Sequence, residues 1–195
     1  MNESESGRDE ARIGPQVYPV LKIAKLHEHH PGLTPALGEC FYEAICICLD
    51  RHHQSPVKFR VSNPADALHF IEFAKPDRRI RNAWANTIDA TETGAYGICL
   101  AAVEATEKLV AIRRSETETG CDFYVAAPGT TSGDIEGWFR LEVSGLDEGS
   151  VSMIEARLRQ KITQARKGRS KLPALVSVVG FKELVVRIER VRDFE

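Results

Sequence analysis

The chain has 195 residues, of which 43% are hydrophobic and 28% are charged, a composition typical of a folded globular protein rather than a disordered one. It has no apolar run close to the roughly 20 residues that a membrane-spanning helix needs, and residues 1–10 are polar and acidic, unlike a signal peptide. The net charge of −2 does not by itself indicate a nucleic-acid-binding protein.

The first 88 residues predict a tail followed by a mainly helical region. Residues 1–15 are mostly polar, which predicts a flexible tail, and a helical region is expected over 16–88. The apolar spacing over 17–27 is compatible with a short amphipathic helix. Thr34 and Pro35 predict the start of a second, largely buried helix, because proline is tolerated in the first turn.

A short alternating strand and another helix are expected before the end of this region. Residues 57–61 alternate between apolar and polar, which predicts a strand. Asn63 and Pro64 then predict the start of a helix that continues to about residue 74. A change of pattern after residue 88 favours a separate unit over 89–195.

From residue 89 the predicted order of elements is helix, three strands, helix and strand, followed by a last strand. Asp89 and Glu92 have the spacing of a capping box, so the first helix is expected to begin there and to end near residue 107. The second helix is expected to begin at Ser150 or Ser152. Strands are expected over 109–112, 121–127, 138–144, 174–179 and 184–191, although a helix is also compatible with the last of these.

The cysteines indicate the cellular compartment of the protein, and the histidines are considered as metal ligands. The five cysteines cannot all pair within one chain, and Cys46 and Cys48 lie in an apolar helix pattern, so we expect a reducing, cytoplasmic environment. The histidines at 27, 29, 30, 52 and 53 are open to two interpretations, a metal site or polar loop contacts, and the second is favoured because the run at 27–30 directly precedes Pro31 and Gly32.

Two acidic residues fall in predicted strands of the second half. Asp122 begins the second strand and Glu142 lies within the third. A buried carboxylate needs a cation, strong donors or solvent, and two carboxylates on neighbouring strands can share a divalent metal, for which Mg²⁺ is well suited. The alternative is that each belongs to the polar face of its strand.

This order of elements, with Asp on the second strand and Glu on the third, resembles the αβββαβ core of the PD-(D/E)XK, or restriction-endonuclease-like, nucleases over about residues 89–181. The resemblance implies an α/β fold that cleaves DNA with Mg²⁺ or Mn²⁺ held by Asp122 and Glu142. The family's lysine two positions after the second acid is replaced here by Ser144, which is a departure from the family pattern.

The resemblance also implies further catalytic candidates on the two helices. Some members carry the missing lysine, or a glutamine, on the helix after the third strand, where this chain has Lys161 and Gln164. Many members carry a glutamate on the first helix, which corresponds to Glu92. The alternatives are a solvated helix face for Lys161 and Gln164, and the capping-box role for Glu92.

Basic charge gathers on and after the second helix, with no acid among the residues concerned. Such a surface predicts DNA binding without sequence specificity, because phosphate contacts release counterions. Arg113 and Arg114 extend it in one interpretation; a solvated surface or a docking site for an acidic protein is the alternative. The expected DNA-binding residues are Arg157, Arg159, Arg166, Lys167, Arg169 and Lys171, beside Lys161.

Two functions follow as hypotheses. The first is a Mg²⁺-dependent endodeoxyribonuclease that acts in restriction, repair or phage defence. The second is a catalytically inactive, nuclease-like scaffold subunit that binds a protein partner or another copy of itself, and Ser144 is the residue that favours it. Neither hypothesis involves a membrane.

Overall fold

A computed structural model describes residues 17–116, 120–130, 133, 135–167 and 170–191, so the predicted tail over 1–15 lies outside its described part. In chain order the elements are η1 (Leu26–Glu28), α1 (Pro35–Asp50), β1 (Val57–Asn63), β2 (Ala65–Ile71), α2 (Arg78–Ala83), α3 (Thr87–Glu107), β3 (Val110–Arg114), β4 (Phe123–Ala126), η2 (Ile135–Gly137), β5 (Phe139–Leu146), α4 (Val151–Arg166), β6 (Ala174–Gly180) and β7 (Val185–Val191). Among these residues no helix is both long and apolar enough to cross a membrane.

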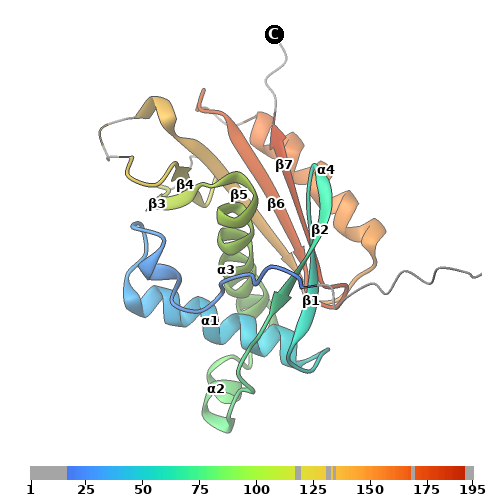
Figure 1. Cartoon of the computed structure of the whole chain (residues 1–195). Helices are drawn as coiled ribbons and strands as arrows, with labels where there is room; N and C mark the ends of the chain where they lie inside the picture. The colour runs from blue at the N-terminus through green and yellow to red at the C-terminus, as the bar shows by residue number, and fades with distance from the viewer. Residues whose placement is uncertain (1–16, 117–119, 131–132, 134, 168–169, 192–195) are drawn as a thin grey trace, which may run out of the picture.

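The strands form one seven-stranded sheet in the order β2-β1-β7-β6-β5-β4-β3, and helices cover both of its faces (Figure 1). On β6, Leu175 and Val179 pack into the core with α1 and α3, whereas Val176 and Val178 pack against α4. Neighbouring residues of β6 thus face opposite layers, as the period of a strand requires. The α/β class is therefore confirmed.

The second half contains the elements that its sequence predicts. Strands β3, β4 and β5 form an antiparallel meander, and α4 connects β5 to the parallel strand β6. A parallel neighbour requires such a crossover connection, which explains why a helix separates β5 from β6. The last segment is strand β7, antiparallel to β6, and not the alternative helix.

The prediction of a mainly helical N-terminal region is wrong in two segments. Residues 65–71 form strand β2, which pairs with β1 from Val57↔Ile71 to Asn63↔Ala65. Residues 17–25 are not helical; residues 19–21 pair with β2, where Leu21 donates to the carbonyl of Phe70, and of the predicted helix over 17–27 only the end lies in η1. Pairing with a neighbouring strand outweighed local helix propensity in both segments.

The predicted helices begin close to the expected residues, with one correction. The hydroxyl of Thr34 accepts from the amide of Leu37 at 3.2 Å, so α1 is capped as its sequence predicts. Helix α3 begins at Thr87 and is capped by Asn86, so the capping box of Asp89 and Glu92 is wrong. Asn86 accepts from two amides of the first turn, a stronger cap than a residue already inside the helix.

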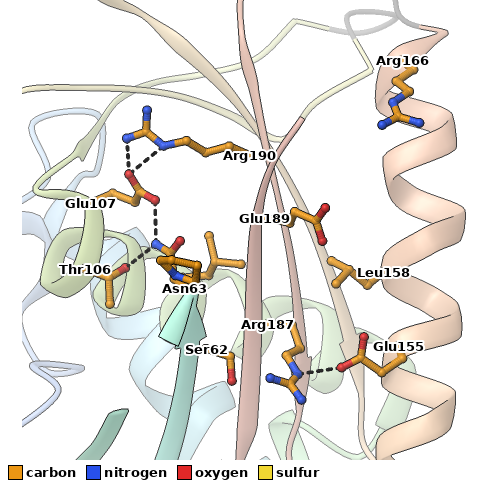
Figure 2. Close-up of a pocket in the computed structure, with 12 residues that line it drawn as sticks. Ser62, Asn63, Thr106, Glu107, Glu155, Leu158, Arg166, Arg187, Glu189 and Arg190 are labelled. Atoms are coloured by element: carbon orange, nitrogen blue, oxygen red, sulfur yellow. Dashed lines mark hydrogen bonds and ion pairs between the residues drawn. The ribbon is translucent and has the colours of Figure 1, made fainter. Parts of the chain in front are cut away.

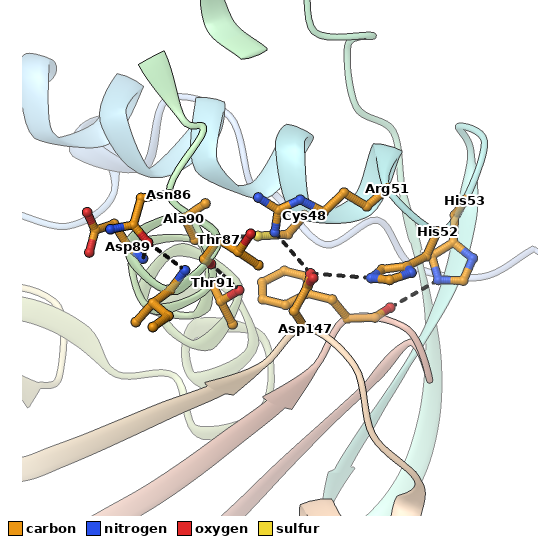
Figure 3. A network of polar contacts seen from close by, with 12 residues as sticks. Cys48, Arg51, His52, His53, Asn86, Thr87, Asp89, Ala90, Thr91 and Asp147 are labelled. Carbon is orange, nitrogen blue, oxygen red and sulfur yellow. Dashed lines mark hydrogen bonds and ion pairs between the residues drawn. The ribbon is translucent and has the colours of Figure 1, made fainter. Parts of the chain in front are cut away.

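Polar contacts tie the end of α1 to the loops that follow β5 and β6 (Figure 3). Asp147, directly after β5, forms an ion pair with Arg51 at 3.2 Å and lies 3.3 Å from the ring nitrogen of His52. The next residue, His53, donates to the carbonyl of Phe181 at 3.0 Å. These contacts account for His52 and His53 as polar loop residues.

A glycine allows α3 to lie close against β5. A Cβ added to Gly145 would come within 2.6 Å of the carbonyl oxygen of Thr91, a backbone atom that cannot easily move. The absence of a side chain at Gly145 therefore sets the distance between this helix and this strand. The same packing brings the next turn of α3 towards the start of β4, where the candidate site lies.

Candidate functional site

Asp122 lies directly before β4 and is held by the neighbouring strand β5. Its amide donates to the carbonyl of Leu141 at 2.8 Å, and its Oδ2 accepts from the amide of Val143, also at 2.8 Å. Burial raises the pKa of Asp122, and the hydrogen bond from Val143 opposes that rise. The backbone of β5 therefore fixes the orientation of a carboxylate that is costly to ionise.

Glu142 is buried within β5 and is paired with Lys161 of α4. The ammonium of Lys161 donates to Oε1 of Glu142 at 2.6 Å. Burial raises the pKa of Glu142, the hydrogen bond from Lys161 opposes this, and the charge of Asp122 raises the pKa further. The charge of Asp122 therefore acts on Glu142 in the same direction as burial, and the ammonium of Lys161 acts against both.

Asp122 and Glu142 line one open pocket of about 280 Å³. The structure thus brings together the two acids that the sequence places on neighbouring strands. Lys161 approaches the same point from α4 and lowers the pKa of Asp122 as well as that of its own partner. Ser144 lies two residues after Glu142, hence on the same face of β5, so Lys161 provides the positive charge on the face where Ser144 provides none.

Tyr96 connects helix α3 to the pocket. Its hydroxyl lies 2.9 Å from Oε1 of Glu92 and 3.1 Å from Oδ1 of Asp122. Burial raises the pKa of Tyr96, and the nearby charge of Asp122 adds to this effect, so the phenol stays protonated and donates. Glu92, one of the candidate residues, therefore reaches Asp122 through Tyr96, a residue that was not among the candidates.

Arg114 is a second residue whose position was not predicted. Its guanidinium lies over the rings of Tyr96 and Phe123, with 4.5 and 4.6 Å to the ring centroids, and it lines the pocket with Asp122 and Glu142. Stacking on aromatic rings holds an arginine in place while its N–H groups stay available for an anion. The neighbouring pair Arg113 and Arg114 at the end of a strand was the only sequence signal.

The remaining candidates lie away from the pocket. Gln164 is exposed on α4 and does not line it. Arg157 is half-buried, Arg166 lines a different cavity, and Arg169 lies outside the described residues. Arg159, Arg166, Lys167 and Lys171 are exposed.

A buried arginine explains part of the local structure after α4. Arg140 of β5 donates to the carbonyl of Leu172 at 3.0 Å and to the carbonyl of Ala165 at 3.2 Å. The second contact gives a side-chain donor to a carbonyl in the last turn of α4, where the regular helical pattern supplies none. Arg140 thereby fixes the helix that carries Lys161.

The donors of the pocket fit a hard cation that keeps most of its water. Among the described residues, no group of three or more His, Cys, Asp or Glu side chains is arranged to hold a metal ion. Mg²⁺, however, is often held by only one or two carboxylates together with water and substrate phosphate. Asp122 and Glu142 are such a pair of carboxylates in one pocket.

The run of histidines near residue 30 has a structural role. His30 is fully buried, and its Nδ1 accepts from the amide of Ala111 at 2.9 Å. Its other ring nitrogen lies 3.6 Å from Glu104, which also lies 3.3 Å from His29. These contacts cover part of the edge of strand β3.

Comparisons with protein-family models, with curated proteins and with solved structures found no match to this chain.

Proposed function

We propose that the protein is a Mg²⁺-dependent nuclease with a restriction-endonuclease-like core, which hydrolyses DNA phosphodiester bonds at the pocket of Asp122 and Glu142. The observation that supports this most directly is that the two carboxylates line one pocket while Lys161 contacts one of them. The order of α3, β3, β4, β5, α4 and β6 matches the core expected from the resemblance.

Asp122 and Glu142 would hold the cation, which supplies a polarised water and neutralises charge on the phosphate. The hydrogen bonds from Val143 and Tyr96 keep the carboxylate of Asp122 in one orientation before the cation arrives. Such orientation reduces the rearrangement that binding requires. The ammonium of Lys161 keeps a positive charge beside both acids, where charge accumulates on a phosphodiester during hydrolysis.

Arg114 is suited to hold the substrate at the mouth of this pocket. A guanidinium presents a planar pair of donors that matches the oxygens of a phosphate. The exposed residues Arg159, Lys167 and Lys171 offer further contacts to the DNA backbone. Substrate binding would then depend on charge rather than on base sequence.

Cleavage assays test the proposal. The protein is incubated with supercoiled and linear DNA in Mg²⁺ or Mn²⁺, beside Asp122→Ala, Glu142→Ala and the control Glu183→Gln, which alters an exposed acid away from the pocket. We expect wild type and the control to cleave, and the two pocket variants to lose more than about 100-fold in rate. Cleavage that survives both substitutions would show that another site is responsible.

A second candidate function is a catalytically inactive subunit that binds nucleic acid or protein. The observation that favours it is that Ser144, on the face of β5 that carries Glu142, stands where the family pattern has a lysine. DNA binding by wild type without cleavage in either metal would support this candidate against the first. The same assay series therefore separates the two.

A further inference from the structure

A cavity of about 900 Å³ lies beside β7, away from the carboxylate pocket (Figure 2). One wall is the end of α3, with Thr106 and Glu107, and the opposite wall is α4, with Glu155 and Leu158. The end of β1, at Asn63 and Pro64, closes a third side. Between these walls the cavity is lined by residues 188–190 of β7.

This cavity is located where β1 stops pairing with β7. The two strands are parallel over three registered pairs, the last of which is Ser62↔Arg187. Strand β7 continues to Val191, so its last four residues have no partner from β1, and the chain instead turns into β2. Among the described residues, no other strand replaces β1 along this side of β7.

The sequence provides a reason for this break. The amide of Arg60 donates to the carbonyl of Leu184 at 2.8 Å. Because the bonding groups of a strand alternate in direction, the carbonyl of Ile188 faces the same side of β7, and residue 64 is where β1 would supply its donor. Residue 64 is proline and has no N–H. The ladder therefore cannot continue, and both Ile188 and Arg190 present backbone groups towards the cavity.

The charged side chains around the cavity leave one acid unpaired. Arg190 binds Glu107, and Arg187 binds Glu155 at 2.7 Å, so these charges are satisfied within the protein (Figure 2). Glu189 is exposed, points towards the α4 side, and has no hydrogen bond or ion pair from its carboxylate among the described residues. It is available to a positive charge from outside.

We propose that this cavity binds a short extended segment of a partner protein, which pairs with the free edge of β7 and places a Lys or Arg side chain opposite Glu189. Strand addition uses main-chain hydrogen bonds for affinity and side-chain positions for specificity. The edge of a second folded sheet does not fit, because α3 and α4 stand on either side of the cavity. Nucleic acid is disfavoured because Arg187 and Arg190 are already paired with acids.

Selection from a random nonapeptide library displayed on phage tests this inference with the full chain. Wild type is the bait, and the exposed-site variant Glu189→Lys is used for counterselection. We expect enriched peptides to carry one Lys or Arg between residues with high strand propensity. Synthetic copies should bind Glu189→Lys at least about tenfold more weakly, and a Lys→Glu copy should prefer that variant.

Backbone methylation distinguishes strand pairing from simple charge attraction. In a paired strand, alternate amides face the neighbouring strand, so methylation of one alternate set should abolish binding and methylation of the other set should leave it unchanged. The inference is overturned if no peptide depends on Glu189, or if both methylated sets bind equally. Neither result depends on whether the carboxylate pocket cleaves DNA.

Discussion

The amide of Val143 donates to Oδ2 of Asp122 at 2.8 Å, so the residue directly after Glu142 orients the other carboxylate of the pocket. One strand, β5, thus supplies one acid and positions the second. A small displacement of β5 would move both carboxylates together. Changes at residues that contact either acid should therefore affect stability and function in linked ways.

Replacement of Tyr96 by Phe removes the hydroxyl between Glu92 and Asp122 and keeps the ring beneath Arg114. We expect the free energy of unfolding to fall by about 0.5–1.5 kcal/mol, the net worth of a hydrogen bond, and the Mg²⁺ concentration needed for cleavage to rise. Urea unfolding and a Mg²⁺ titration measure the two effects. Tyr42→Phe is the matched control, because its hydroxyl accepts from Ala74 far from the pocket. If both variants alter the Mg²⁺ requirement equally, Tyr96 does not position Asp122.

Replacement of Lys161 by Met leaves the carboxylate of Glu142, which is 8% exposed, without its cation. Removal of one partner from a fully buried pair costs about 3–5 kcal/mol, and the 19% exposure of Lys161 reduces this to roughly 1–3 kcal/mol. The double variant Lys161→Met with Glu142→Gln should recover most of the loss, because residue 142 then carries no charge that needs a partner. Urea unfolding at neutral pH in EDTA gives the coupling energy between the two substitutions. If the losses in unfolding free energy of the two single variants simply add in the double variant, Lys161 and Glu142 do not interact directly.

The raised pKa of Asp122 predicts a gain in stability when its charge is removed. The folded protein binds the proton of this carboxyl more tightly than the unfolded chain does, so ionised Asp122 lowers stability at neutral pH, and the cost disappears as the pH falls through the folded pKa. Without divalent cations, we expect the free energy of unfolding of Asp122→Asn to exceed that of wild type by about 0.5–2 kcal/mol. Mg²⁺ should raise the melting temperature of wild type only. A less stable variant with an unchanged response to Mg²⁺ would contradict both expectations.

Buried His30 predicts a loss of stability in mild acid. Burial lowers its pKa to about 4 from 6.5, and the neighbouring His29 acts in the same direction. Because the unfolded chain binds the proton more readily, stability is full above pH 6.5 and falls as the pH drops from there towards 4, by at most about 3 kcal/mol. Unfolding curves between pH 4 and pH 8 measure this slope. The slope should flatten in His30→Gln, which can still accept from Ala111; an unchanged slope would assign it to other groups.

DNA binding through α4 predicts a specific salt dependence. Neutralisation of each phosphate contact changes the slope of log binding constant against log salt by about 1. The double variant Arg159→Ala with Lys167→Ala should therefore bind duplex DNA with a slope that is smaller by about 2. Lys75→Ala with Lys182→Ala removes two exposed charges elsewhere and serves as the control. Equal slopes in all three proteins would exclude these two residues from the interface.

Local sequence signals predicted the elements whose structure is decided within a few residues. The Thr34-Pro35 start of α1 and the alternating strands around 57–61 and 185–191 are examples. The same signals misplaced the start of α3, where Asn86 and Asp89 are both plausible caps three residues apart. They also predicted a helix over residues that form β2, because strand formation there depends on pairing with β1.

The sequence by itself determined the α/β class, the order of elements from α3 to β6, and two acids on neighbouring strands. Only the tertiary structure decided that the hydroxyl of Tyr96 reaches Asp122, that Lys161 lies on Glu142, and that Pro64 leaves the end of β7 unpaired. The physical reason is that capping and periodicity act over one or two turns, whereas these contacts join segments brought together by the packing of helices against the sheet.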